Sequence, residues 1–467
     1  MKNSIYNFVF SVDSAQYVYN LLTTAIAEIN EKVASAIREN KLALICDKDK
    51  SDLYANGFLV DDCVDETKAY QYFYDSIRYG RSATTLHVTI IPTYACNLAC
   101  PYCLQGSSKD SNFLSLEQLN SILKFIRTKS LPRKNYVAPD RLFVSFYGGE
   151  PMLAKHLLPY FCDETARIAD EAEIERVFDM TSNFTLLDDA MMDLIRKHKI
   201  NVQVSIDGSR EQHNQRRIFP DGRGTYDLIL QNLKKMADAG LSQRLTIRIN
   251  TDRDSLHSAR ETFNAVRGFA GSVYFSFLAT YKGANDSYAN CIPPDCYSAI
   301  MMNNFNPILR ANGDEEMRLF GKKSPCALVC ENKYWIDCFL DVYKCETLVK
   351  RPECKIGTLS ANGELQLNYA YYEQMNCVPF SQKKCCACKL LPVCGGGCPA
   401  KEYIDAGKND GKINNCQCAI TEEKLRRMLV SFVCANRQEN ICVGTCVRNI
   451  LAPPSDAVTS DDVKTMP

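Results

Sequence analysis

The sequence predicts an α/β protein built on a partial (β/α)6 barrel, with a small module before the barrel and a cysteine-rich domain after it. Strand-like and helix-like segments alternate from Leu86 to Leu278, only two of the 24 Cys precede residue 85, and cysteines crowd the chain after residue 319. We expect four parts with the bounds 1–84, 85–318, 319–433 and 434–467.

The first part reads as a separate small module. Its pattern predicts a strand from Tyr6 to Val12, a helix from Gln16 to Ile37, a short strand from Leu42 to Cys46 and a helix that leads to Gly57.

The second part has the rhythm of a parallel sheet. Its strand-like segments are apolar on both faces and are separated by helices, which is typical of parallel sheets covered by helices. The strands are expected at LHVTII, RLFVSF, VFDMTS, NVQVSID, RLTIRIN and SVYFSFL, and the helices near 116–128, 157–172, 188–198, 226–239 and 255–269.

The helix rhythm stops after about Met317, where cysteines are separated by Gly, Pro and short polar runs. This composition predicts a part organised around metal ions. A last helix is expected from Thr421 to Val433. The tail APPSDAVTSDDVKTMP is polar and contains Pro, so we expect it to be disordered.

The composition excludes several classes of function. Lys plus Arg equals Asp plus Glu at 55 each, which removes the bulk-charge argument for a nucleic-acid or acidic-membrane partner. The first residues lack a secretory signal, and no apolar stretch is long enough to cross a bilayer. We therefore expect a cytoplasmic protein that binds neither nucleic acid nor membrane, in which many Cys indicate metal or redox chemistry.

Three cysteines follow the first barrel strand directly: Cys96, Cys100 and Cys103 in TYACNLACPYC. α/β barrels place reactive groups on the loops at the carboxyl ends of their strands. A structural zinc site or an ordinary ferredoxin cluster uses four ligands, so a triplet leaves one iron position open. The triplet alone indicates either an iron–sulfur cluster or zinc.

The next strand ends in FYGGEP, which supplies Gly148, Gly149, Glu150 and Pro151 at the same rim. Together with the triplet and Tyr102, this resembles the radical SAM superfamily. The resemblance implies a [4Fe-4S] cluster whose fourth iron is chelated by S-adenosylmethionine. It also implies that the GGEP backbone and Glu150 contact the methionine amino group.

Later strand ends extend the resemblance. TSNFTLL is similar to the usual TNGTLL and places Thr181, Ser182 and Asn183 near the cofactor, with Phe184 where glycine is usual. Further positions implied for the cofactor side are Ser205, Asp207, His213, Arg217, Arg248 and Asn250. Asp207-Gly208 is also a plain turn signal, His213 suits a structural hydrogen bond better than catalysis, and Arg248 suits an ion pair.

The C-terminal cysteines resemble the SPASM extension. The resemblance implies a first auxiliary [4Fe-4S] cluster on Cys326, Cys330, Cys345 and Cys398, and a second on Cys385, Cys388, Cys394 and Cys416. Cys386 and Cys418 are alternative ligands, and Leu340 replaces a glycine usual five residues before Cys345. A zinc ribbon is the other interpretation of the CxxC pairs.

The resemblance implies that S-adenosylmethionine is cleaved by one electron and that the resulting 5′-deoxyadenosyl radical takes a hydrogen atom from substrate. The protein orients the reactants and excludes water. It also implies a low-potential electron donor such as ferredoxin or flavodoxin, and three [4Fe-4S] clusters in total.

The expected substrate is a ribosomally made precursor peptide, modified by a thioether or carbon–carbon crosslink or a similar oxidation. The first part resembles the winged-helix-like element that binds leader peptides in many peptide maturases. Glu346, directly after Cys345, is the candidate catalytic base and favours the alternative, a sulfatase-maturating enzyme that forms formylglycine. A second alternative is a non-catalytic electron carrier or scaffold.

Overall fold

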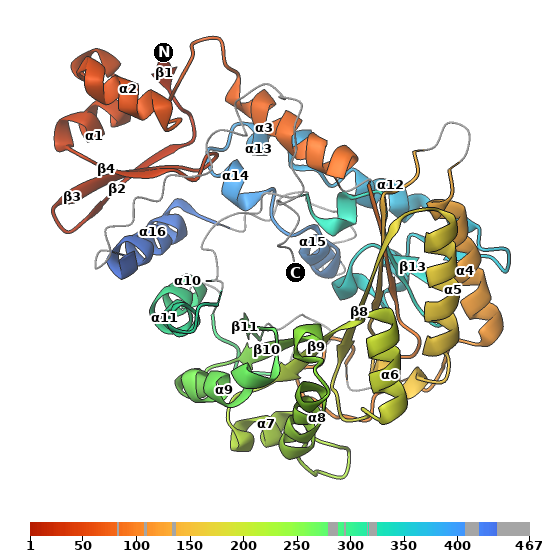
Figure 1. Cartoon of the computed structure of the whole chain (residues 1–467). Coiled ribbons are helices and arrows are strands. Elements are labelled where there is room, and N and C mark those ends of the chain that lie inside the picture. Colours follow the sequence, from red (N-terminus) through yellow and green to blue (C-terminus); the bar gives the residue numbers. More distant parts are fainter. Residues whose placement is uncertain are drawn as a thin grey trace.

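A ten-stranded sheet forms the centre of the protein (Figure 1). The computed structural model describes residues 1–81, 84–106, 110–132, 137–278, 288–293, 296–314, 316, 325–406 and 420–436. Within the sheet the strand order is β11-β10-β9-β8-β7-β6-β12-β13-β14-β15, and it does not close on itself.

The strands from β6 to β11 lie side by side in chain order and are all parallel. This confirms the predicted parallel-strand arrangement of the second part. Their bounds are β6 Thr85–Ile90, β7 Arg141–Phe146, β8 Glu175–Ser182, β9 Asn201–Ile206, β10 Leu245–Thr251 and β11 Ser272–Phe277.

Helices follow these strands and line the outside of the sheet (Figure 1). They are α4 Leu116–Ser130, α5 Leu158–Glu171, α6 Asp189–His198, α7 Arg210–Arg216, α8 Tyr226–Asp238 and α9 Ala259–Val266. The short helix α7 is missing from the predicted set. Its signal is the capping box of Ser209 and Gln212, which satisfies the first backbone N–H groups of the helix.

Alternate residues of each parallel strand face opposite sides of the sheet. One set, including Leu142, Val144 and Phe146, packs with the helices in the main apolar core. The other set is more polar, with Ser145 on β7 and Asp179 on β8 in register. We call the side that faces away from the helices the inner face.

The cysteine-rich part extends this same sheet. β12 Lys333–Ile336 pairs in parallel with β6, and β13 Asp341–Tyr343, β14 Gly357–Leu359 and β15 Leu365–Leu367 add an antiparallel meander. The predicted bound at residue 318 therefore does not separate two sheets. The short helices are α10 Tyr297–Ile300, α11 Asn306–Ala311, α12 Tyr369–Met375, α13 Lys383–Cys386, α14 Leu391–Cys394 and α15 Pro399–Ala406.

The amino-terminal module is a three-stranded antiparallel sheet with helices. Its strands are β2 Asn7–Val12, β3 Ala15–Asn20 and β4 Ile26–Ile29, and a small pair joins β1 Lys2–Asn3 to β5 Leu59–Val60. Its helices are α1 Glu31–Arg38, α2 Asp47–Ala55 and α3 Glu66–Asp75. The winged-helix resemblance stays a prediction.

Two predictions for this module are wrong. The helix expected from Gln16 to Ile37 is replaced by β3, β4 and the short α1, because Thr24 turns the chain with φ +62° and the side chain of Asn30 caps α1. The strand expected from Leu42 to Cys46 is a 3₁₀ turn, Leu42–Leu44.

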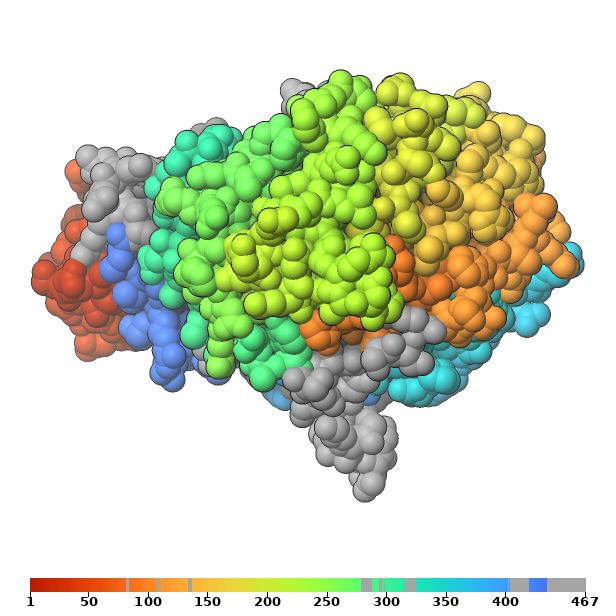
Figure 2. Space-filling model, turned by 90° about the horizontal axis from the view of Figure 1, so that it is seen from below, coloured from red at the N-terminus to blue at the C-terminus, as the bar shows by residue number. Residues whose placement is uncertain are grey.

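The module docks on the rest of the chain. One face of its sheet shares an apolar core with the α13–α14 segment and with α16 Glu422–Asn436, which confirms the predicted last helix. Helix α16 also contacts α10 and the following turn, so it lies between the module and the segment after β11 (Figure 2). No helix in the described ranges is long and apolar enough to span a membrane. The predicted disordered tail lies outside those ranges.

Candidate cluster and cofactor site

The cysteine triplet lies on the loop after β6, at the carboxyl end of the parallel strands, as predicted. Cys96, Cys100 and Cys103 are each partly exposed. The backbone N–H of Leu98 and the side-chain amide of Asn183 both point at the sulfur of Cys96, at 3.4 and 3.8 Å. Donors around a sulfur suit a thiolate ligand.

Two glycines fix this loop against the end of β7. A Cβ on Gly148 would lie 2.6 Å from the carbonyl oxygen of Thr93, and a Cβ on Gly149 would lie 2.0 Å from that of Ala95. The backbone N–H groups of Gly149 and Glu150 donate to those same oxygens at 3.1 and 2.8 Å. Glycine is therefore required here because two backbones touch.

Glu150 joins the ends of β7 and β8. Its fully buried carboxylate accepts hydrogen bonds from the backbone N–H of Met152 (3.0 Å), the hydroxyl of Ser182 (2.8 Å) and the backbone N–H of Asn183 (2.6 Å). Burial raises the pKa of Glu150, whereas these donors and Arg217 act in the opposite direction. Pro151 then starts the 3₁₀ turn Pro151–Ala154.

Phe184 keeps the turn that a glycine usually makes. Its φ is +63°, a left-handed conformation that costs a side-chain-bearing residue free energy. The backbone N–H of Phe184 donates to the Ser182 hydroxyl at 2.9 Å, and its carbonyl accepts from Asn232 at 2.8 Å. The ring is fully buried, so packing and these bonds hold the strained turn.

A buried polar network surrounds Asp207 at the end of β9. The Tyr102 hydroxyl donates to one carboxylate oxygen of Asp207, and Asn250 donates to the other at 2.8 Å. Arg217 donates to the Tyr102 oxygen at 3.1 Å. The network joins the cysteine loop, β9, β10 and the residue after α7, so the implied cofactor positions lie together.

His213 has a structural place in this network. Its Nδ1 accepts from the backbone N–H of Asp207 at 3.3 Å, and its Nε2 lies 3.0 Å from the hydroxyl of Thr225. Burial holds the pKa of His213 well below its usual range, with Arg217 and Arg216 adding to the effect. The neutral ring bridges two elements, which favours the structural interpretation.

Four buried side-chain atoms near the carboxyl ends of β9 and β10 lack a hydrogen-bond partner within the described part of the chain. They are Arg217 Nε, Arg248 Nε, Asn250 Oδ1 and Thr251 Oγ1. Buried polar atoms are normally paired, so this set of donors and acceptors fits a polar ligand. Ser205 is buried on the same strand as the ribose-side motif.

The inner face carries residues that the sequence analysis missed. The Tyr274 hydroxyl donates to Gln203 at 2.6 Å, and Gln203 donates to Thr181 at 3.5 Å. Asp179 accepts from Ser145 at 3.3 Å. Burial raises the pKa of Asp179 to about 6.

Glu346 reaches this face from the cysteine-rich part. Its side chain is exposed to solvent, yet surrounding protein raises its pKa, and the guanidinium of Arg248 acts in the opposite direction. Arg248 in turn hydrogen-bonds Tyr274. The predicted base therefore lies within electrostatic range of Arg248 on β10 and Tyr274 on β11.

Two members of the predicted first auxiliary set lie in one small core. Cys326 and Cys345 pack against the buried residues Leu328, Leu348 and Tyr403. The sulfur of Cys330 donates to the carbonyl of Cys326 at 3.4 Å. Cys398 immediately precedes α15, which contacts the turn that follows Cys345.

Only part of the predicted second auxiliary set lies within the described residues. Cys385, Cys388 and Cys394 lie in the core shared with the amino-terminal module. Cys386 instead points at the carbonyl of Phe380, 3.4 Å away, which favours Cys385 as the ligand. Cys416 and Cys418 lie outside the described residues. Within the described ranges no three His, Cys, Asp or Glu side chains converge tightly enough for a single metal ion.

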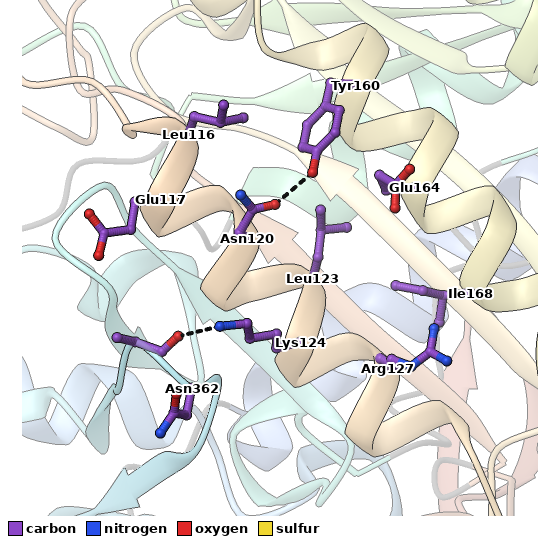
Figure 3. A pocket seen from close by; sticks show the side chains of 11 residues that line it. Leu116, Glu117, Asn120, Leu123, Lys124, Arg127, Tyr160, Glu164, Ile168 and Asn362 are labelled. Carbon is purple, nitrogen blue, oxygen red and sulfur yellow. Dashed lines mark hydrogen bonds between the residues drawn. The ribbon is translucent and has the colours of Figure 1, made fainter.

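A surface groove of about 620 Å³ lies on the helix-covered side of the sheet, opposite the inner face. Figure 3 shows the side chains that line it. Helices α4 and α5 and the β14–β15 turn form its walls. Two of its polar side chains donate hydrogen bonds within the groove: Tyr160 to the side chain of Asn120 at 2.7 Å, and Lys124 to the backbone carbonyl of Ala361 at 3.0 Å. The groove belongs to the outer helical layer, separate from the cysteine loop.

Comparison with known proteins agrees with this geometry. Residues 90–264 match the radical SAM superfamily. The range starts at the last residue of β6 and ends in α9. It therefore contains the triplet, the GGEP segment and the network around Asp207.

Similar proteins include two kinds of maturase. Mycofactocin maturase MftC of Mycolicibacterium smegmatis is 23% identical over 340 residues, 69% of this chain and 80% of the relative. A cysteine-type anaerobic sulfatase-maturating enzyme of Clostridium perfringens is 24% identical over 332 residues, 65% of this chain and 85% of the relative.

Two solved structures share the fold. The structure of anSMEcpe with bound AdoMet has a TM-score of 0.57 at 20% identity and covers 77% of this chain and 99% of its own. Streptococcus suis SuiB bound to S-adenosylmethionine has a TM-score of 0.52 at 13% identity and covers 90% of this chain and 100% of its own. Residues 90–264 therefore form a radical SAM domain, and the chain is an enzyme whose relatives include maturases of peptides and proteins.

Proposed function

We propose that this enzyme matures a ribosomally made precursor peptide by removing hydrogen from it and forming a thioether or carbon–carbon crosslink. The observation that carries the proposal is the docked amino-terminal module, which shares one core with the cysteine-rich part. A module fixed in this way suits a chain that must hold one part of a peptide while another part reacts.

The fold comparison supports this choice. The match to SuiB leaves out a tenth of the chain, less than the 84 residues of the module, so it must include part of that module. SuiB has also been solved with its precursor peptide SuiA. In the module, β4 pairs with β3 on one edge only among the described strands, and an open strand edge can accept a peptide strand.

The superfamily implies a [4Fe-4S] cluster and S-adenosylmethionine, which together supply a 5′-deoxyadenosyl radical for hydrogen abstraction. Cys96, Cys100 and Cys103 would hold the cluster. The unpaired polar atoms beside the Asp207 network support a cofactor at that point. The residues assigned to it are Tyr102, Gly148, Gly149, Glu150, Pro151, Ser182, Asn183, Ser205, Asp207, Arg217 and Arg248.

Two auxiliary clusters on the C-terminal cysteines would accept the electron that remains when a substrate radical closes a new bond. The first would use Cys326, Cys330, Cys345 and Cys398, and the second Cys385, Cys388, Cys394 and Cys416. Because every assigned ligand is a Cys, an electron-accepting role is favoured over binding of a substrate thiolate. A ferredoxin or flavodoxin would supply the first electron.

Glu346 would take the substrate proton. Crosslinking removes one hydrogen atom, one proton and one electron from the peptide, so a carboxylate near the reacting residue is needed. Its raised pKa makes it a better base than an ordinary glutamate. Maturation should therefore slow as the pH falls through that raised pKa, because the protonated carboxyl accepts nothing.

The inner face would hold the residue that reacts. Asp179, Gln203 and Tyr274 offer hydrogen bonds, and the edge-to-face pair of Tyr147 and Trp335, with ring centroids 5.2 Å apart, offers apolar surface. A mixed lining of this kind suits a peptide side chain.

Sulfatase maturation is the second candidate, and Glu346 directly after Cys345 is the observation that favours it. Two incubations of the reduced enzyme distinguish these functions. One contains a Cys-containing precursor peptide encoded beside its gene, and the other contains a sulfatase-derived peptide. Loss of H₂ from the precursor with a new crosslink, and no change in the sulfatase peptide, supports the proposal. Formylglycine in the sulfatase peptide alone overturns it.

Two further arms complete this experiment. Glu346→Gln should form 5′-deoxyadenosine but little crosslink, whereas an unchanged product yield would remove Glu346 from the mechanism. A non-catalytic electron carrier would form no 5′-deoxyadenosine from S-adenosylmethionine and dithionite.

A further inference from the structure

The inner face of the sheet changes character from one side to the other. Strand β12 and strand β7, with the residue that follows β7, place the partly buried rings of Trp335, Phe143 and Tyr147 on it. Tyr147 and Trp335 meet edge to face, with ring centroids 5.2 Å apart. Strands β8 to β11 instead bring polar side chains to this face. They are Asp179, Thr181, Gln203, Arg248 and Tyr274.

Most of this polar side is hydrogen-bonded within itself. The Tyr274 hydroxyl donates to the side-chain oxygen of Gln203 at 2.6 Å, and the side-chain nitrogen of Gln203 donates to Thr181 at 3.5 Å. Arg248 lies beside Tyr274 in the register of β10 and β11. These contacts extend from β8 to β11, so the polar side forms one continuous wall.

Asp179 is the exception in this wall. The hydroxyl of Ser145 is its hydrogen-bond partner within the described residues, at 3.3 Å, which is longer than a normal O–H···O bond. No Lys, Arg or His side chain in the described ranges forms an ion pair with Asp179. A partly buried carboxylate without a cation is unfavourable, and burial accordingly raises the pKa of Asp179 to about 6. The carboxylate therefore favours a cation from outside the chain.

Asp179 also lies at the border between the two walls. Its register partner on β7 is Ser145, the inner-face residue between Phe143 and Tyr147. A ligand that contacts both walls needs an apolar portion next to a cationic group. Lysine and arginine have this form, because their aliphatic stems can lie on aromatic rings while the charged ends reach a carboxylate.

Two arginines of the same face are already engaged. Arg141, at the start of β7, forms an ion pair with Glu175 at 2.6 Å. Strand β9 separates Arg248 from the strand that carries Asp179, and the negative charge of Glu346 lies within electrostatic range of Arg248. These positive charges therefore leave the Asp179 carboxylate uncompensated.

We propose that Asp179 binds the cationic side chain of a lysine or arginine of the substrate peptide, and that the stem of this basic residue lies on the aromatic wall beside Trp335. The proposal rests on the peptide substrate proposed above and specifies one chemical feature of it. Asp179 is then a residue that determines specificity, because it selects peptides by their charge near the residue that reacts.

The test is a binding measurement on the reconstituted full chain, saturated with S-adenosylmethionine and kept oxidised so that no reaction starts. The probes are three synthetic peptides, acetyl-Ala-Ser-Xaa-Ala-amide, in which Xaa is lysine, norleucine or glutamate. Norleucine keeps the aliphatic stem of lysine without its charge. We expect calorimetry to give a Kd about tenfold lower for the lysine peptide than for the norleucine peptide. Equal affinities, or no measurable binding of the lysine peptide, would overturn the proposal.

Two variants at the same position sharpen the test. Asp179→Asn keeps the shape of the side chain and should bind the lysine and norleucine peptides equally. Asp179→Lys should reverse the preference and bind the glutamate peptide most tightly. A tenfold preference for lysine that survives in Asp179→Asn would place the cation site elsewhere.

Glu175→Gln is the matched control. Glu175 lies on the same strand and the same face as Asp179 but is already paired with Arg141. This variant removes the same charge from the face and should keep the tenfold preference for the lysine peptide. Loss of the preference in Glu175→Gln as well would show an effect of overall charge and contradict the specific role of Asp179.

The result is independent of the crosslinking experiment. If the wild type prefers the lysine peptide and Asp179→Asn does not, but no precursor is crosslinked, charge selection by Asp179 holds and the proposed reaction fails. If the precursor is crosslinked but the probes bind without preference, only the role of Asp179 fails.

Discussion

The two halves of the central sheet differ in how they are stabilised. The strands from β6 to β11 have six to eight residues each and are covered by helices. The strands from β12 to β15 have only three or four residues, and the connections from β12 to β13 and from β13 to β14 carry cysteines. Short strands bury little surface, so we expect the stability of the second half to depend more on the predicted cluster ligands.

A pair of strained turns shows the same contrast on a smaller scale. Phe184 ends β8 with φ +63°, and Leu340 lies between β12 and β13 with φ +64°. Each stands where the resemblance expects glycine, and each keeps the left-handed backbone. Phe184 is fully buried among barrel residues, whereas Leu340 is 9% exposed at the edge of the core. The two halves thus tolerate one kind of strain with different packing support.

The largest expected effect is a difference in reaction products between cysteine variants of the two halves. Cys96→Ala should abolish 5′-deoxyadenosine formation, because the cluster that binds the cofactor cannot form. Cys330→Ala should leave formation of 5′-deoxyadenosine intact but abolish crosslinked peptide. Chromatography of both products from one reaction checks this. Loss of 5′-deoxyadenosine in both variants would show that the halves are not functionally distinct.

The turns provide the second prediction. Phe184→Gly should destabilise the protein by about 1–4 kcal/mol, because losing a buried ring costs about 3–5 kcal/mol and relief of the left-handed backbone returns about 1–2. Leu340→Gly should cost less, about 0–2 kcal/mol, because burial of a leucine contributes about 1.5–3 kcal/mol and relief of the left-handed backbone returns about 1–2. Anaerobic urea unfolding measures both. Phe184→Ala should be less stable than Phe184→Gly, and the reverse order would exclude backbone strain.

The third prediction concerns Asp179 on the inner face of the parallel half. Its pKa of about 6 lies above that of an unfolded aspartate, about 3.9. The folded protein therefore holds the proton more tightly, so Asp179 costs stability as the pH rises from about 4 to 6. Asp179→Asn should be more stable than the wild type at pH 7, by about 1–2 kcal/mol after allowance for its partial exposure, and equally stable near pH 4. A constant difference at both pH values would contradict this.

The smallest effect is expected on the outer helical layer. Tyr160→Phe removes one hydrogen bond in the groove between α4 and α5 (Figure 3). Stability should change by less than about 0.5 kcal/mol, and both reaction products should form at the wild-type rate. A clear loss of product with normal 5′-deoxyadenosine would instead connect this groove to the substrate.

The sequence predicted correctly those features that depend on short, continuous segments of the chain. The six parallel strands follow from apolar runs such as RLFVSF, and the position of Cys96 at a strand end follows from its distance to LHVTII. The helix expected across Gln16 to Ile37 was wrong, because Thr24 and Asn30 divide this stretch into two strands and a short helix.

Other features depend on contacts that a single sequence does not reveal. Pairing of β12 with β6 joins segments separated by about half of the chain. Nothing in the sequence distinguishes Asp179 from the other aspartates. Its strand register, opposite Ser145, is what places it on the inner face. Glu346 comes under the electrostatic influence of Arg248, which lies on a strand far away in the sequence. Each of these needs the fold before the residue can be recognised.

The packing of α16 on β2 has a consequence for synthesis in the cell. The apolar face of the first sheet emerges from the ribosome about four hundred residues before the helix that covers it. At about 5–20 residues per second, that face waits roughly 20 to 80 s for its partner. We expect chaperones to bind the nascent chain at this exposed apolar surface. Synthesis of α16 then allows the apolar face of the first sheet to be buried.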